Sequence, residues 1–244
     1  MSASMGTEDR KQRERQARES LFIDTAREQI REDGLLGLQM SKLAAACEYA
    51  TGALYQHFAS REDLLAAVAT RTTLEHAERF RRIPELPLGT RSQMLALVLT
   101  DLDFAAARPD HYRLTQYLVT EAVWANVSGE RREALLQAAR PISEAVSRVV
   151  QNARDNGDLP EAREISAEEM GLGPWALNQG MQKLANARGL LEAYDIGQPL
   201  DHLIRHFHAL MTGWRWEPRL DPDEPAVVQA ETRRVRDILS RELA

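Results

Sequence analysis

The apolar positions of the chain recur at helical spacing, and no segment alternates convincingly in the manner of a strand. Phe22, Ala26 and Ile30 form one stripe of a helix expected over residues 16–33, with Gly34 as the residue that ends it. Further helices are expected over residues 95–106, 109–118, 130–156, 166–188, 199–213 and 225–243. The pattern therefore predicts an all-α fold.

Two shorter helices are expected over residues 41–47 and 51–58, followed by a longer one from 61 to about 80. Ser60 precedes three polar residues that include Glu62 and Asp63, which is the signal of an N-cap with acids in the first turn. The apolar residues that would face inward on the two short helices are Leu43, Ala44, Cys47, Leu54 and Phe58. Two short helices around a tight corner are typical of a helix-turn-helix.

The remaining residues of the second short helix suit contact with DNA. Gly52 and Ala53 are small enough to let a helix backbone approach the double helix closely. Thr51, Tyr55, Gln56 and His57 carry groups that can bond to phosphates or read base edges. Any one of them is more often an ordinary surface residue, so the prediction depends on the whole pattern.

Proline and glycine residues divide the rest of the chain. Pro84, Pro87 and Gly89 interrupt the helical pattern and indicate a domain boundary. The expected organisation is a basic flexible arm over residues 1–15, a helix-turn-helix domain over 16–80 and a larger helical domain over 81–244. Pro141 should kink or split the helix that contains it.

The charge of the chain is uneven. The net charge is −6 and the calculated pI is about 5.6, which counts mildly against nucleic-acid binding. Residues 10–18, however, hold five basic side chains and the single acid Glu14. Such a segment can bind DNA while the rest of the chain stays acidic. Without the helix-turn-helix pattern, a solvated and partly disordered leader would be the preferred explanation.

The single cysteine, Cys47, excludes a disulfide within the chain and reads as a small core residue. The N-terminal segment is charged and lacks the apolar stretch of a secretory signal. No apolar run approaches the roughly 20 residues of a membrane span. We therefore expect a cytoplasmic protein.

No catalytic arrangement is visible in the sequence. His202, His206 and His208 lie close together, but without neighbouring cysteines a surface or dimer helix explains them better than a metal site. Asp101 and Asp103 lack partners for acid–base chemistry and are interpreted as solvated helix positions. The sequence thus indicates no enzyme, no cofactor and no metal.

Candidate effector-binding residues can be chosen in the second half, although core packing is the simpler explanation for each aromatic. The irregular segment 171–174 could widen a cavity beside Trp175, with two polar residues one and two turns further on. The candidates are Phe104, Tyr117, Trp124, Trp175, Asn178 and Gln182.

The segment LAAACEYATGALYQHFASREDLL resembles the TetR family of bacterial transcriptional regulators. The family pattern is approximately I-A-x-x-A-G-V-S-x-G-x-L-Y-x-H/Y-F-x-x-K-x-x-L. The matching residues are Leu43, Ala44, Gly52, Leu54, Tyr55, His57, Phe58, Arg61 in place of lysine, and Leu64. The later segment FAAARPDHYRLTQYLV resembles a stretch found in many family members.

The resemblance implies a set of DNA-binding residues. Thr51, Gly52, Ala53, Tyr55 and Gln56 would lie on the recognition helix, and Tyr55, His57 and Arg61 resemble phosphate-contacting positions. Ser41 and Lys42 would meet the backbone at the start of the preceding helix.

The chain departs from the family pattern in the turn. Glu48 stands where the family has a glycine suited to a left-handed backbone, at a cost of about 1 kcal/mol. Ala50 replaces a serine that would cap the recognition helix, and Thr51 could cap it instead by shifting the helix start by one residue.

By resemblance, the chain is a homodimeric repressor that binds a palindromic operator, dimerises through helices 166–188 and 199–213, and is released by a small-molecule effector. Activation rather than repression is also compatible with the sequence, which does not encode where the operator lies relative to a promoter. The alternative is a helical ligand-binding or protein-interaction module that has lost sequence-specific DNA binding. Glu48, Ala50 and the acidic balance of the chain motivate that alternative.

Overall fold

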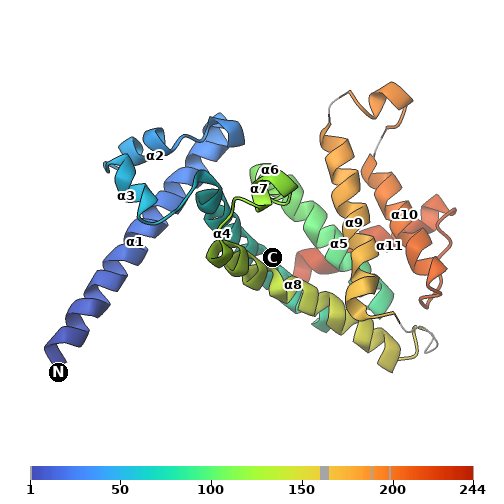
Figure 1. Ribbon diagram of the computed structural model, residues 1–244. Helices are drawn as coiled ribbons and strands as arrows, with labels where there is room; N and C mark the ends of the chain where they lie inside the picture. Colours follow the sequence, from blue (N-terminus) through green and yellow to red (C-terminus); the bar gives the residue numbers. More distant parts are fainter. Residues whose placement is uncertain (1, 160–164, 188, 198, 244) are drawn as a thin grey trace. The chain divides into compact units, whose positions relative to one another are not determined.

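The computed structural model describes residues 2–159, 165–187, 189–197 and 199–243, and within these ranges every regular element is helical (Figure 1). The elements are α1 (Ser2–Asp33), η1 (Leu35–Gly37), α2 (Met40–Ala46), α3 (Thr51–Tyr55), α4 (Arg61–Arg82), η2 (Ile83–Glu85), α5 (Thr90–Ala107), α6 (Pro109–Leu118), α7 (Glu121–Trp124), α8 (Gly129–Asp155), α9 (Ala167–Asn186), η3 (Glu192–Tyr194), α10 (Pro199–Gly213) and α11 (Pro225–Glu242). The predicted all-α fold is confirmed.

The chain forms two compact units that interleave along the sequence, whereas the sequence suggested a linear division near residue 80. Unit 1 comprises Met1–Glu75 and Ala107–Ala139, and unit 2 comprises His76–Ala106 and Arg140–Ala244. Two helices, α4 and α8, therefore begin in unit 1 and end in unit 2.

Unit 1 is built around the helix-turn-helix. Its core contains the apolar stripe of α1 together with the predicted inward faces of α2 and α3, all of them buried. These residues are Phe22, Ala26, Ile30, Leu43, Ala44, Cys47, Leu54 and Phe58. Leu114, Leu118 and Val123 of α6 and α7 complete the same core. The short helices are thus held by tertiary packing, since helices of this length do not persist alone in water.

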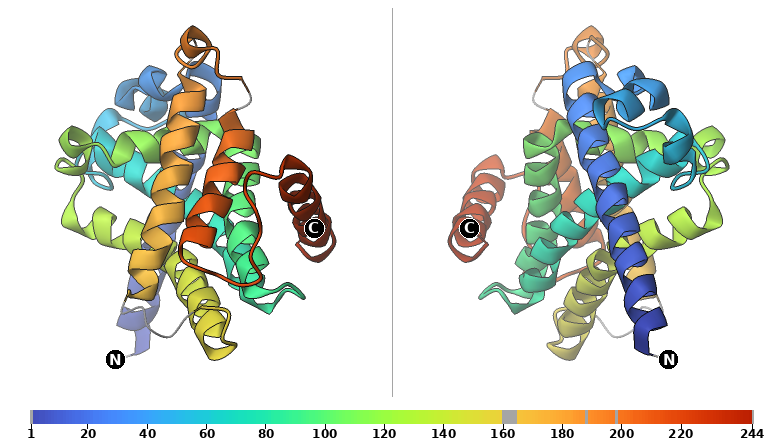
Figure 2. Two further views of the ribbon diagram at one scale, coloured as in Figure 1. Left: turned by 90° about the vertical axis from the view of Figure 1, so that its right-hand side faces the viewer. Right: turned by 90° about the vertical axis from the view of Figure 1, so that its left-hand side faces the viewer.

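Unit 2 has a separate apolar core. Leu95 and Leu99 of α5 pack in it with Val149 of α8, Phe207 of α10 and the fully buried Trp216. Helices α9 and α10 pack against each other along their lengths, which Figure 2 shows in its left view. Within the described residues, no helix combines the length and the apolar character needed to cross a bilayer.

The ends of several helices follow local signals. The Ser60 hydroxyl accepts a hydrogen bond from the Asp63 amide at 3.0 Å, which confirms the predicted N-cap of α4. Pro109 and Pro225 open α6 and α11 as expected. Pro141 does not split its helix, because the loss of one amide donor leaves the bonds of the flanking turns intact. The change from unit 1 to unit 2 falls beside it, between Ala139 and Arg140.

The first residues of the chain differ from the expected arm. The structure continues α1 through residues 2–15, and the side chains from Glu8 to Ala17 are exposed.

Candidate nucleic-acid interface

The turn between α2 and α3 has the geometry of a Schellman motif. The Glu48 amide donates to the carbonyl of Ala45 at 3.1 Å, and the Tyr49 amide donates to the carbonyl of Ala44 at 2.9 Å. Glu48 occupies the position that favours glycine, with φ of 60°. The backbone strain expected from the sequence is therefore present at this residue.

Helix α3, the expected recognition helix, begins at Thr51, with Ala50 as its N-cap residue. Ala50 has the extended backbone of a cap (φ −70°, ψ 146°) but no side-chain group to bond to the first amides. Thr51 does not replace it as a cap, because the helix start is not shifted. One stabilising contact that this turn can hold is thus missing.

The outward face of α2 and α3 carries most of the predicted DNA contacts. Ser41, Lys42, Gly52, Tyr55 and Gln56 are exposed, with Tyr55 at 53%, while Thr51 and Ala53 are half-buried. An alanine Cβ at Gly52 would meet no atom within 4 Å, so the surface there is open. The Lys42 ammonium already pairs with the Asp33 carboxylate.

His57 is placed differently from the sequence prediction. Its side chain is 3% exposed, its Nδ1 lies 3.4 Å from a Glu19 carboxylate oxygen, and its ring meets Phe22 edge-on at 5.5 Å. Arg131 of α8 binds the same Glu19 at 2.8 Å and donates to the His57 carbonyl. His57 therefore fixes α3 against α1 and does not present its side chain to DNA.

Arg61 is also occupied within the protein. Its guanidinium donates to the carbonyl of Leu35 at 2.7 Å and to that of Leu38 at 3.2 Å. These bonds tie the segment before α2 to the start of α4. Arg61, at the position that resembles a phosphate contact, thus stabilises the helix-turn-helix through bonds within the protein.

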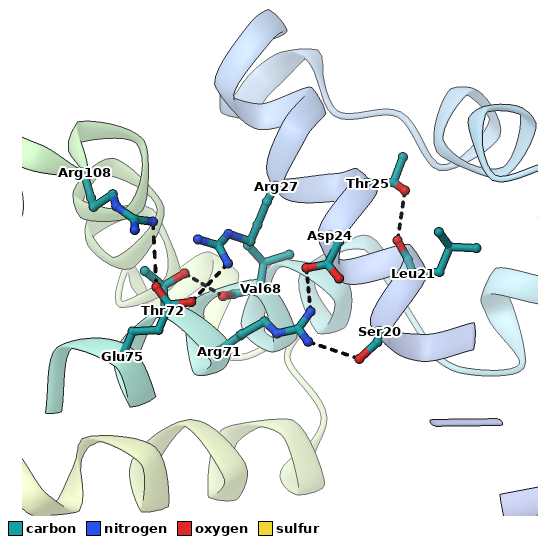
Figure 3. Close-up of polar contacts among 10 residues, drawn as sticks. All are labelled: Ser20, Leu21, Asp24, Thr25, Arg27, Val68, Arg71, Thr72, Glu75 and Arg108. Carbon is teal, nitrogen blue, oxygen red and sulfur yellow. Dashed lines mark hydrogen bonds and ion pairs between the residues drawn. The ribbon is translucent and has the colours of Figure 1, made fainter. Parts of the chain in front are cut away.

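Ion pairs join α1 to α4 on the other side of unit 1. Figure 3 shows Arg71 of α4 bonded to Asp24 of α1 at 2.6 Å. It also shows Glu75 between Arg27 of α1 and Arg108 before α6, at 3.2 and 3.7 Å. Each pair is partly exposed and contributes only a few tenths of a kcal/mol to about 1 kcal/mol. Together they fix the register of α1 on α4.

The basic N-terminal segment lies on exposed positions of α1. Arg10, Lys11, Arg13 and Arg15 are exposed, and Arg10 pairs with Glu14. Further along, the Arg18 guanidinium lies 5.8 Å from the centre of the Tyr49 ring. A positively charged helix surface thus leads to the turn before α3.

Unit 2 contains a largely buried network of hydrogen-bonded polar side chains, and the sequence predicted only some of its members. Gln182 donates to Asn178 at 3.0 Å, Asn178 donates to Asp101, and Asp101 lies 3.0 Å from the His76 Nε2. The His76 ring stacks on Phe104 at 3.9 Å. Three of the proposed effector residues therefore lie together on α5 and α9.

Asp101 corrects an expectation, because it is partly buried between two partners and is not a solvated position. The sequence does not indicate His76, because no local pattern distinguishes it. Only the packing of α4, α5 and α9 brings His76 into this polar network.

The other three effector candidates lie elsewhere. Tyr117 and Trp124 belong to unit 1, where Tyr117 packs at the edge of the core. Trp175 belongs to unit 2 but is 61% exposed on α9. Each unit thus holds part of the predicted set.

The histidines of α10 also separate. His202 and His206 are exposed with stacked rings, while His208 is buried. The part of the chain that the structure describes holds no group of three metal-ligating side chains.

Solved structures resemble this fold at low sequence identity. A protein of unknown function from Rhodococcus sp. RHA1 is 22% identical over 81% of this chain and 95% of its own, with a TM-score of 0.62. The transcriptional regulator FadR from Bacillus subtilis, solved with stearoyl-CoA, is 15% identical over 80% of this chain and 98% of its own, with a TM-score of 0.59. SmeT, the repressor of a Stenotrophomonas maltophilia multidrug efflux pump, is 18% identical over 84% and 93% of the two chains, with a TM-score of 0.52.

A search of curated protein sequences found no significant match. A family model does match residues 22–68, from the stripe of α1 through α2 and α3 into α4. Its description is "Bacterial regulatory proteins, tetR family". Residues 22–68, which include the helix-turn-helix, thus match the DNA-binding region of the TetR family of bacterial regulatory proteins.

Proposed function

We propose that the chain is a ligand-responsive repressor that binds a palindromic operator as a homodimer. The outward face of α3 carries this proposal. Gly52 and Ala53 leave the helix backbone accessible, and Tyr55 and Gln56 extend from the same short helix. The buried Leu54 and Phe58 anchor that helix to its support, so it can act as a rigid probe of the major groove.

Helices α9 and α10 expose apolar side chains that suit a dimer interface. Leu172, Trp175 and Leu184 of α9 are exposed apolar side chains, and Leu200 of α10 is another. Large exposed apolar side chains on paired helices are typical of a surface that another protein covers. We propose that two copies join here about a two-fold axis, with Trp175 in the interface.

The dimer would present two α3 helices to successive major grooves, about 34–36 Å apart on B-DNA. The basic residues of α1 would add phosphate contacts that carry no sequence information. Ser41, Lys42, Thr51, Gly52, Ala53, Tyr55 and Gln56 are the residues that we assign to the DNA. His57 and Arg61 would act indirectly by holding α3 and α2 in position.

The effector would act on unit 2. We propose that a small, largely apolar molecule binds near the polar network of Asn178, Asp101 and His76. These side chains would hydrogen-bond to a polar group of the ligand. Helix α4 passes from unit 1 into unit 2 between Glu75 and His76, so it is the natural carrier of the signal. A coupling of about 1–3 kcal/mol would change operator affinity roughly 5- to 150-fold.

The test is fluorescence-polarisation binding to duplexes selected from a randomised pool. Tyr55→Ala should weaken binding at least tenfold while the circular-dichroism spectrum stays unchanged. Tyr194→Ala is the matched control, because Tyr194 is an exposed tyrosine of unit 2. Equal affinities of the two variants would remove Tyr55 from the interface.

A second candidate is a regulator-like module that has lost DNA binding. The exposed acid Glu48 beside α3 and the uncapped Ala50 favour it. This function requires that no duplex bind measurably even at low salt, where phosphate contacts are strongest.

A further inference from the structure

A small cavity lies in unit 2 where the first turn of α5 meets α10, α11 and the segment between those two helices. Its volume is about 150 Å³, which corresponds to roughly five water molecules at about 30 Å³ each. It shares no residue with the polar network around His76. The proposed effector site therefore does not account for it.

Arg91 is a buried cation in the wall of this cavity. It is 4% exposed and donates to the carbonyls of Trp216 at 2.7 Å and His208 at 3.1 Å, and to the Thr212 hydroxyl at 2.9 Å. Within the described residues, its Nε has no acceptor and no ion pair joins the guanidinium to a carboxylate, although Glu217 and Glu231 attract it from further away. Burial lowers the pKa of Arg91 to about 10, so it stays charged at neutral pH. Its charge lacks a direct counterion.

His208 lines the same cavity with unused bonding capacity. The residue is 1% exposed, and neither ring nitrogen has a partner among the described residues. Burial and the nearby Arg91 charge lower its pKa to about 4, so the ring is neutral and offers one N–H donor. Buried polar atoms without partners are rare in folded proteins, which makes this pair a candidate for ligand recognition.

The rest of the cavity wall holds paired charges and apolar side chains, so Arg91 is the lining cation that lacks an ion-pair partner among the described residues. Arg219 and Arg234 line it, but Arg219 already pairs with Glu217 at 2.9 Å and Arg234 with Glu231 at 2.8 Å. Glu231 is the one acid among the described lining residues. The Glu231 carboxylate already accepts from the Ser92 hydroxyl at 2.6 Å and from Arg234 at 2.8 Å. A further negative charge would therefore be favourable beside Arg91.

We propose that this cavity binds a small organic carboxylate. The carboxylate would supply the missing counterion of Arg91 and accept the N–H of His208. Leu220 and Val227 line the cavity as well and would contact the short hydrocarbon part. The small volume suits a short-chain acid, and the apolar wall favours it over an inorganic anion.

The test is calorimetric titration of the full chain, without DNA, with sodium propionate at constant ionic strength maintained with sodium chloride. We expect saturable binding that is at least tenfold weaker in His208→Leu, which removes the donor. Val227→Phe, which fills the cavity from α11, should weaken binding similarly and keeps the test valid if the first variant fails to fold. His206→Leu is the matched control on the exposed side of α10 and should bind as the original chain does.

The proposal is overturned if propionate does not bind, or if the two cavity variants bind it as tightly as the control. Sulfate binding as tightly as propionate would overturn the organic-acid assignment. The titration needs neither DNA nor an effector, so its outcome is independent of the proposed repressor function.

Discussion

The turn between α2 and α3 holds two residues, Glu48 and Ala50, whose replacement should make the folded protein more stable. Glu48 adopts φ of 60°, where a non-glycine residue is destabilised by about 1 kcal/mol relative to glycine. Ala50 occupies an N-cap without a capping side chain, and a serine there typically contributes about 1 kcal/mol. Glu48→Gly and Ala50→Ser should each stabilise unit 1.

The expected gain can be stated for thermal unfolding. One kcal/mol shifts the midpoint of a chain of this size by roughly 2–4 °C, so the double variant should gain about 4–8 °C if the two effects add. Differential scanning calorimetry would measure the shift, and hydrogen exchange of the α2 and α3 amides would locate it. Removal of the exposed Glu48 charge should also strengthen DNA binding at low salt.

Ala45 supplies the matched controls, because it is an exposed position of α2 three residues before Glu48. Ala45→Gly and Ala45→Ser introduce the same residues into regular helix and should lower stability by about 1 and 0.5 kcal/mol. The reasoning is refuted if Glu48→Gly destabilises the protein as much as Ala45→Gly does.

Three further predictions concern other parts of the chain. Gly52→Ala should preserve or raise stability, because the new methyl group meets no atom within 4 Å, yet it should weaken DNA binding at least tenfold in polarisation assays if the backbone approaches the groove. Trp175→Glu should convert a dimer into a monomer in light scattering, whereas an unchanged mass would place the interface elsewhere. His208 has a pKa lowered from 6.5 to about 4 by burial and Arg91, so the unfolded chain takes up a proton that the folded chain lacks as the pH falls. The free energy of unfolding should have its full value above about pH 6.5 and be lower by about 2 kcal/mol at about pH 5. Urea unfolding should show that His208→Leu lacks this part of the pH dependence.

The helices could be predicted because their signals are local. The stripe of Phe22, Ala26 and Ile30, the cap at Ser60 and the prolines at 109 and 225 each act within a few residues of themselves. The strain at Glu48 was visible for the same reason, since one backbone angle decides it.

The orientation of single side chains could not be predicted in this way. His57 lies in the turn after α3, directly after the exposed Tyr55 and Gln56, but its side chain faces inward toward Glu19, which is 38 residues away. Arg61 is bound by carbonyl groups more than 20 residues before it. The polar network of His76, Asp101 and Asn178 likewise depends on the packing of three helices. Such contacts need the tertiary structure.

The central claim is that α3 is a DNA-reading helix presented in pairs. Hydroxyl-radical footprinting of the full chain on a selected duplex tests it most directly. The account predicts two protected half-sites related by inverted symmetry, with centres 10–10.5 base pairs or a multiple of that spacing apart, and loss of protection in Tyr55→Ala. Protection without symmetry, or a footprint that Tyr55→Ala leaves unchanged, would contradict it.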